Sequence, residues 1–182
     1  MNFIPTQIPD VILIKPDVFR DERGIFFESY QKQRFTEARI SLDFVQDNCS
    51  GSRRGVLRGL HYQVKQPQGK LVHVIAGEIF DVAVDIRRSS PTFGQWIGIN
   101  LSSQNKHQLW IPPGFAHGFF VLSEWAEISY KATDYYAPQW ERTILWNDPA
   151  LGIEWPLTVG SAPSLSPKDA NGKILAEAEI FE

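Results

Sequence analysis

Three side chains in the sequence are of the types that move protons beside a carbonyl group. His61 titrates near neutrality, so it can remove and return a proton at physiological pH. Lys70 can place a positive charge next to an enolate oxygen, and Tyr130 carries a phenol that can donate a proton. Together they suit removal of a proton next to a ketone, followed by protonation from the other side.

Each of these residues also fits an ordinary structural role. A lone histidine in a strand is often structural, a strand lysine is usually solvated, and a strand tyrosine usually packs. Taken one at a time, the residue types leave both interpretations open. Their combination, together with the sequence around them, favours a site for proton transfer.

A metal site is the main chemical alternative. The segment Pro112–His117 resembles the second signature of the cupin barrels, Pro-x-Gly-x-x-His. Metal-binding cupins also need two histidines one residue apart, with a glutamate a few positions later. Here Gln63 stands where the second histidine should be, and no glutamate follows before Glu78. Because transition metals prefer three or four His, Cys or carboxylate ligands, we expect a barrel without a catalytic metal.

The elements that must position these side chains are predicted to be short β-strands. The run Phe80–Asp85 alternates with period 2, which places Phe80, Val82 and Val84 on one face. Turn signals every 8–12 residues or so are typical of an antiparallel sandwich or barrel. The predicted strands are Val11–Ile14, Ile25–Tyr30, Lys70–Ala76, Glu78–Ile86, Trp96–Leu101, Gln108–Ile111, Gly118–Leu122 and Ala126–Tyr136.

Helical signal is weak and confined to two segments, Gln31–Ile40 and Lys173–Ile180. The 182 residues fit one domain, with a core over about residues 10–156 and a tail over 157–182 that packs on the barrel. The prediction is therefore an all-β fold with a few short peripheral helices.

Composition excludes several classes of protein. A net charge of -3 argues against a nucleic-acid-binding surface, and no apolar run approaches the roughly 18 residues of a membrane span. The single Cys49 cannot form an internal disulfide, and no Gly-rich dinucleotide or phosphate-loop motif is present. These features predict a cytoplasmic protein. The six tryptophans fit either a sheet-rich core or a stacking surface for a base or sugar.

Six segments resemble the dTDP-4-dehydrorhamnose 3,5-epimerase family, in order and with similar spacing from about residue 2 to Asp169. They are Phe19–Gly24, Phe44–Asn48, Gly55–Gln63, Gly69–Val72, Phe80–Asp85 and Pro113–Phe119. The resemblance implies a cupin-type jelly roll, a homodimer and no cofactor. It also implies a substrate, dTDP-4-dehydro-6-deoxy-D-glucose, epimerised at C3 and C5 to dTDP-4-dehydro-L-rhamnose.

The resemblance implies a role for each catalytic candidate. His61 is similar to the family's base, and Asp169 to the carboxylate that orients and charges it. Tyr130 resembles the acid that protonates carbon from the other face. Lys70 resembles the residue beside the C4 oxygen.

Further positions resemble the family's substrate contacts. Arg58 and His117 would line the sugar site, and Tyr136 would either stack on thymine or simply pack. The nucleotide would be contacted by the segment Gln46, Asp47 and Asn48. The partner subunit would contribute further substrate contacts through an exchanged strand, from Arg23, Phe26 and Glu28. Additional binding positions would be Glu141 and Lys168.

Two features of the sequence fit this interpretation poorly. Arg58 and His61 are three residues apart, so a regular strand would point them to opposite faces. We therefore expect a bulge or twist at Gly59. The spacing of nine residues from His61 to Lys70 is one less than the resemblance implies, so we expect a shortened loop at Val64–Gln68, whose conformation the sequence does not predict.

Two other functions compete. A related epimerase acting at one carbon, or a ketoisomerase, would share the barrel, the base and the nucleotide contacts. Tyr130 favours double epimerisation, because it supplies an acid opposite the base. A non-enzymatic jelly roll that binds a carbohydrate or nucleotide would need the aromatic residues, but not His61, Lys70, Tyr130 and Asp169 together.

Overall fold

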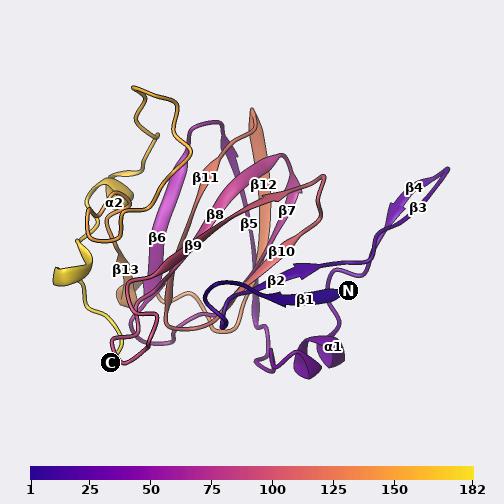
Figure 1. The fold of residues 1–182 in the computed structure, drawn as a ribbon, viewed down its shortest axis with the longest axis horizontal. Helices are drawn as coiled ribbons and strands as arrows, with labels where there is room; N and C mark the ends of the chain where they lie inside the picture. The colour runs from indigo at the N-terminus through magenta and orange to yellow at the C-terminus, as the bar shows by residue number, and fades with distance from the viewer.

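The computed structural model describes all 182 residues, and most of its strands form two facing antiparallel sheets (Figure 1). The six-stranded sheet has the order β1 (Asn2–Pro5), β2 (Ile12–Lys15), β10 (Gln108–Ile111), β7 (Lys70–Ala76), β12 (Trp125–Ala132), β5 (Gln46–Arg53). The five-stranded sheet has the order β13 (Glu141–Thr143), β6 (Leu57–Gln63), β11 (Phe115–Val121), β8 (Glu78–Asp85), β9 (Trp96–Ser102). The predicted all-β jelly-roll class is confirmed.

The remaining elements are small. A hairpin of β3 (Phe19–Asp21) and β4 (Gly24–Phe26) projects from the body of the molecule (Figure 1). The helices are α1 (Lys32–Glu37) and α2 (Pro167–Ala170), with 3-10 turns at Pro138–Trp140 and Leu175–Glu177. None of the helices has the length and hydropathy needed to cross a membrane.

The space between the sheets is apolar at one end and polar at the other. Along β7 the inward positions are Lys70, Val72 and Val74, and the two valines belong to the main buried cluster. On β12, Ile128 is buried in the same cluster, and Tyr130 packs at its margin. The apolar end therefore holds the sheets together, and the other end is left for polar side chains.

The outer face of the five-stranded sheet is covered by the C-terminal tail. Phe80, Val82 and Val84 share one face of β8, as the alternation predicts, and they pack in a second apolar cluster. Tail residues Leu175 and Ile180 pack against this cluster, and Figure 1 shows the tail beside β6 and β13. Both faces of β8 are therefore buried.

Several predicted strands match the structure closely. β7 and β10 have the predicted bounds, β8 and β9 differ from the prediction by one residue at one end, and β2 is shifted by one residue at both ends. β11 begins at Phe115 rather than Gly118, because the turn ends at Gly114, where a φ of +93° suits glycine. The predicted strands do not include β1, β3, β5, β6 or β13.

Three predicted elements are corrected. The strand Ile25–Tyr30 ends at Phe26, because the chain leaves the hairpin and Phe27 packs edge-on against His73. The strand Ala126–Tyr136 ends at Ala132, beyond which side chains satisfy the backbone. The helix Lys173–Ile180 is reduced to a 3-10 turn, because Lys173 bridges to Ile144 and the tail follows the sheet.

Candidate active site

A polar cavity of about 320 Å³ lies at the polar end of the space between the sheets. Predicted site residues that line it are Gln46, Asn48, Arg58, His61, Lys70, His117, Tyr130, Tyr136, Glu141 and Lys168. Lining residues that the sequence did not single out are Ser50, Gln68, Gly118 and Phe119. The structure thus brings together residues separated by more than a hundred positions.

A bulge in β6 aims Arg58 and His61 at the same cavity. On the neighbouring strand β11, His117 pairs with His61 and Phe119 pairs with Arg58. Two residue steps on β11 thus face three on β6, so β6 carries an extra residue. Gly59 has a φ of +131°, and a Cβ there would meet the backbone of Gly118 at 2.5 Å. The predicted irregularity at Gly59 is confirmed.

His61 is held by the carboxylate of Asp169. Its Nε2 lies 2.5 Å from Asp169 Oδ1, and the His61 side chain retains 23% exposure whereas that of Asp169 retains 4%. An ionised carboxylate only accepts hydrogen bonds, so this contact assigns the proton to Nε2 and leaves Nδ1 as the free base. Burial lowers the pKa of His61, against the opposing effect of Asp169, so the imidazole is neutral at physiological pH.

Asp169 is fixed by a helix cap that the sequence encodes locally. Ser166 accepts a hydrogen bond from the Asp169 backbone N–H, and its hydroxyl donates to Asp169 Oδ2 at 2.7 Å. Burial alone would raise the pKa of Asp169, but hydrogen bonds from His61 and Ser166 outweigh burial and lower it. Ser166 was not predicted as a site residue, although Ser-x-x-Asp before a helical turn is a capping signal.

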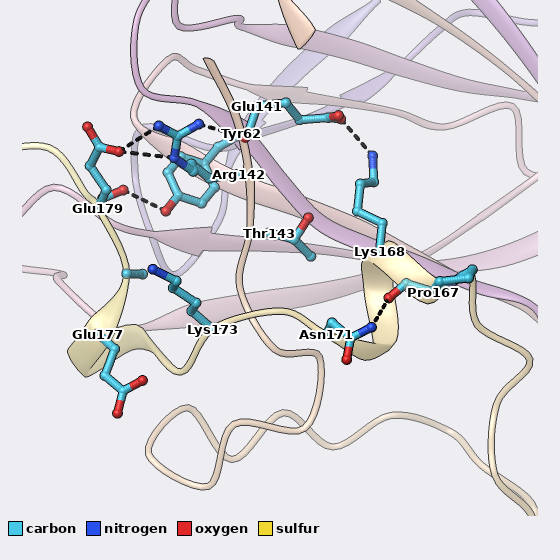
Figure 2. Close-up of a pocket in the computed structure, with 11 residues that line it drawn as sticks. Tyr62, Glu141, Arg142, Thr143, Pro167, Lys168, Asn171, Lys173, Glu177 and Glu179 are labelled. Atoms are coloured by element: carbon cyan, nitrogen blue, oxygen red, sulfur yellow. Dashed lines mark hydrogen bonds and ion pairs between the residues drawn. The ribbon is translucent and has the colours of Figure 1, made fainter. Parts of the chain in front are cut away.

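The tail that carries Asp169 is tied to the barrel beside a second cavity, of about 650 Å³ (Figure 2). Arg142 on β13 donates to the Glu179 carboxylate at 2.8 and 3.0 Å, and the Tyr62 hydroxyl donates to the Glu179 carbonyl. Lys168 pairs with Glu141 at 2.9 Å. These contacts hold the tail, and with it Asp169, against β6.

Lys70 and Tyr130 face the cavity from the six-stranded sheet, opposite His61. The Lys70 ammonium lies 6.0 Å from the centre of the Tyr130 ring. Burial lowers the pKa of Lys70 to about 8, against the opposing charges of Glu141 and Asp81. Burial raises the pKa of the Tyr130 phenol, so it keeps its proton at neutral pH. The cavity therefore holds a base on one wall and an acid on the other.

His117 is supported by a buried carboxylate that the sequence did not reveal. The fully buried Asp81 lies 2.9 and 3.1 Å from His117 Nε2. Asp81 belongs to the alternating strand β8, where a polar residue between apolar ones suggests a solvent-facing position. Here that face points into the barrel, next to the cavity.

Positive charge dominates the cavity wall. Glu141 is committed to Lys168 and accepts a hydrogen bond from the Tyr136 hydroxyl at 3.0 Å. Burial would raise the pKa of Glu141, but these contacts, led by the one from Lys168, lower it. Arg58 donates to Ser52 Oγ at 3.0 Å and, like Lys70, forms no ion pair with a carboxylate. Such a wall suits an anionic ligand.

The other predicted contacts lie outside the cavity in this single chain. Asp47 points to the opposite face of β5 from Gln46 and Asn48, and pairs there with Lys131. Arg23 and Phe26 lie on the projecting hairpin, with 89% of the Arg23 side chain exposed. Glu28 pairs with Arg34 at 3.4 Å. These positions remain predictions.

The residues present are poorly suited to a metal. No group of three or more His, Cys, Asp or Glu side chains is arranged to hold an ion. Gln63, at the cupin ligand position, directs its amide to backbone atoms of Gln66, Tyr135 and Ala137. Gln63 therefore does not supply the side-chain ligand that a metal-binding cupin has at this position.

Residues 5–177 match the sequence profile of a family described as dTDP-4-dehydrorhamnose 3,5-epimerase. The chain belongs to the dTDP-4-dehydrorhamnose 3,5-epimerase family. Its sequence is 63% identical over 175 residues to the dTDP-4-dehydrorhamnose 3,5-epimerase of Pseudomonas aeruginosa, covering 96% of each chain.

Solved structures of family members share the fold. The dTDP-6-deoxy-D-glucose-3,5-epimerase of Legionella pneumophila, solved in complex with dTDP-4-keto-L-rhamnose, is similar with a TM-score of 0.94 at 57% identity, covering 98% of this chain and 94% of that one. A 3'-monoepimerase from Streptomyces bikiniensis, solved in complex with dTDP-quinovose, is similar with a TM-score of 0.87 at 32% identity, covering 94% and 87%. The fold therefore carries both double and single epimerisation.

Proposed function

We propose that this epimerase inverts C3 and C5 of dTDP-4-dehydro-6-deoxy-D-glucose to give dTDP-4-dehydro-L-rhamnose. The observation that carries the proposal is the placement of a neutral, carboxylate-held base and a protonated phenol on opposite walls of one cationic cavity. Removal and return of a proton on opposite faces of a carbon is what inversion requires.

The ketone at C4 makes the hydrogens on C3 and C5 acidic. His61 Nδ1 takes one of them as a proton, and the electron pair of the broken C–H bond moves to the C4 oxygen, forming an enolate. Lys70 stabilises that negative charge. Tyr130 then donates its proton to the opposite face of the same carbon, and the electrons return from oxygen to carbon. Solvent then takes the proton from His61 and returns one to the Tyr130 phenolate, and the sequence repeats at the second carbon.

Product stereochemistry tests the proposal. Purified protein incubated with the keto-sugar, without any cofactor, should yield a sugar whose proton couplings in NMR show inversion at both C3 and C5. Activity should persist after exhaustive chelation, since the proposed steps use only side chains. A product inverted at one carbon would favour the single-site epimerase, and an unchanged substrate would exclude both enzymes.

Tyr130→Phe should separate the two halves of the reaction. The variant loses the phenolic proton but keeps His61 and Lys70, so proton removal continues while protonation from the far face slows. We expect exchange of substrate hydrogens with solvent at a measurable rate, with doubly inverted product falling by roughly 10²-fold. Tyr135→Phe, on an exposed ring, is the matched control. Full product formation by Tyr130→Phe would remove the phenol from the mechanism.

The pH dependence of kcat/KM follows from two groups that must hold opposite protonation states. His61 must be neutral, and burial places its pKa below the ordinary 6.5, so activity rises with pH below that value. Lys70 must be charged, and its pKa of about 8 means that activity falls as pH rises through 8. Lys70→Arg should shift the alkaline limb upward, since arginine stays charged. An alkaline limb that stays near pH 8 in Lys70→Arg would assign it to another group.

We also propose a homodimer in which the projecting hairpin completes the partner's site. Phe19 is 65% exposed and Phe26 72%, and exposed aromatic residues on an isolated hairpin indicate a surface that another chain covers. The lone chain leaves Arg23 and Phe26 outside its own cavity, although both resemble substrate contacts.

Mixing two inactive variants tests this exchange. His61→Ala lacks the base, and Arg23→Ala lacks the hairpin contact. If hairpins are exchanged, half of randomly formed dimers are mixed, and each mixed dimer has one site with both parts intact. Co-expression should therefore restore about a quarter of the wild-type sites. If each hairpin served its own chain, the mixture would gain nothing.

A further inference from the structure

The segment 134–137, which carries Tyr136 into the cavity, has no strand partner to hold it. β12 ends at Ala132, and the 3-10 turn begins at Pro138. Backbone polar groups that are buried without a regular partner need other hydrogen bonds. The position of Tyr136 therefore depends on side chains from outside the segment.

Three glutamine side chains supply those hydrogen bonds. Gln68 Nε2 donates to the Asp134 carbonyl at 2.8 Å. Gln63 Nε2 donates to the Tyr135 carbonyl at 3.2 Å. Gln46 Oε1 accepts from the Tyr136 N–H, and Gln63 Oε1 accepts from the Ala137 N–H, each at 2.8 Å. Gln63 thus holds the backbone on both sides of Tyr136.

Gln63 also joins this segment to the loop that follows β6. Its Nε2 donates to the Gln66 carbonyl at 2.7 Å, and Gln66 has a φ of +52°, a backbone conformation that needs external support. Gln63 is 3% exposed, so both amide hydrogens and the amide oxygen are used inside the protein. The short loop Val64–Gln68 is therefore part of the support for Tyr136.

We infer that Gln63 is a positioning residue for nucleotide affinity, acting through Tyr136 without touching the reacting sugar. This inference rests on the proposed function, because it takes Tyr136 to be a contact of the nucleotide. Gln63 does not line the cavity, whereas Tyr136 and its hydroxyl partner Glu141 both do. Loss of the Gln63 amide should weaken binding and leave proton transfer in place.

A double-mutant cycle with dTDP as the probe tests the inference. Gln63→Met keeps the side-chain length but removes the amide, leaving buried backbone groups unpaired. Calorimetry should show a Kd for dTDP raised about tenfold, which corresponds to one lost buried hydrogen bond. The turnover number kcat should change by less than about twofold. The acid limb of the pH profile of kcat/KM, which reports the pKa of His61, should not move. Gln104→Met, on an exposed turn without hydrogen bonds from its side chain, should bind as the wild type does.

The Tyr136→Ala background decides whether Gln63 acts through Tyr136. There, Gln63→Met should raise Kd by less than about a further twofold, because the ring it positions is gone. If Gln63→Met fails to fold, Gln63→Asn, whose amide is one methylene too short for the Tyr135 and Gln66 carbonyls, should show the same non-additivity. A full tenfold effect in the Tyr136→Ala background, or a fall in kcat with Kd unchanged, would overturn the inference alone. Wild-type protein that does not bind dTDP would overturn the proposed function as well.

Discussion

His61→Ala should abolish exchange of hydrogen at both C3 and C5 and lower kcat by roughly 10²–10⁴-fold, the usual contribution of a general base. His61 is the neutral, partly exposed imidazole in the cavity, whereas the other lining histidine, His117, has its Nε2 at a fully buried carboxylate. One residue should serve both carbons, since both flank the same ketone. NMR of recovered substrate and product measures the exchange at each position.

The matched control is His107→Ala, which removes a histidine that does not line the cavity. Its turnover and exchange should equal those of the wild type. Binding of dTDP to His61→Ala should also be close to normal, which separates loss of the base from loss of the fold. Normal turnover in His61→Ala would show that another group removes the proton.

Asp169→Asn should lower kcat by roughly 10²–10³-fold while leaving the fold intact, because it replaces the charged partner of His61 with a neutral one of the same shape. The imidazolium formed during the reaction then lacks its counter-charge. The Asp169 contact raises the pKa of His61 against the effect of burial, so its removal should lower that pKa further and move the acid limb to lower pH. The pH profile of kcat/KM measures this shift.

Asp43→Asn is the matched control, since Asp43 is an exposed carboxylate paired only with Lys32. It should alter neither kcat nor the acid limb. An acid limb that moves to higher pH in Asp169→Asn would contradict the role of the carboxylate, even if kcat fell. Loss of activity with an unmoved limb would point to a packing role for Asp169.

Much of the fold could be predicted from local sequence pattern, but segments whose structure depends on tertiary contacts could not. β7 and β10 were predicted to the residue, because apolar runs bounded by turn signals are strong strand indicators. The tail helix at Lys173–Ile180 was wrong, since Leu175 and Ile180 are apolar to pack on β8 and β6 rather than to line a helix. A short helix is marginal on its own, and tertiary contacts decide such segments.

The features of the site likewise divide into those that the sequence predicts and those that it does not. The bulge at Gly59 was predictable, because only an irregular strand can aim Arg58 and His61 at one cavity. Asp81 was not, because a half-buried strand normally points its polar residues to water, whereas the tail covers the other face of β8 and leaves the polar face inside. Gln63 forms hydrogen bonds with the residues on either side of Tyr136, some seventy positions away in the chain. No local sequence pattern indicates such a contact.

The exchange of hydrogen for deuterium by the wild-type enzyme tests the central claim most directly. Keto-sugar incubated with the protein in deuterated water should carry deuterium at both C3 and C5 of the product, since His61 removes each proton and solvent supplies its replacement. Deuterium at one carbon only would contradict double epimerisation. Product without deuterium at either carbon would contradict proton transfer by His61 and Tyr130 altogether.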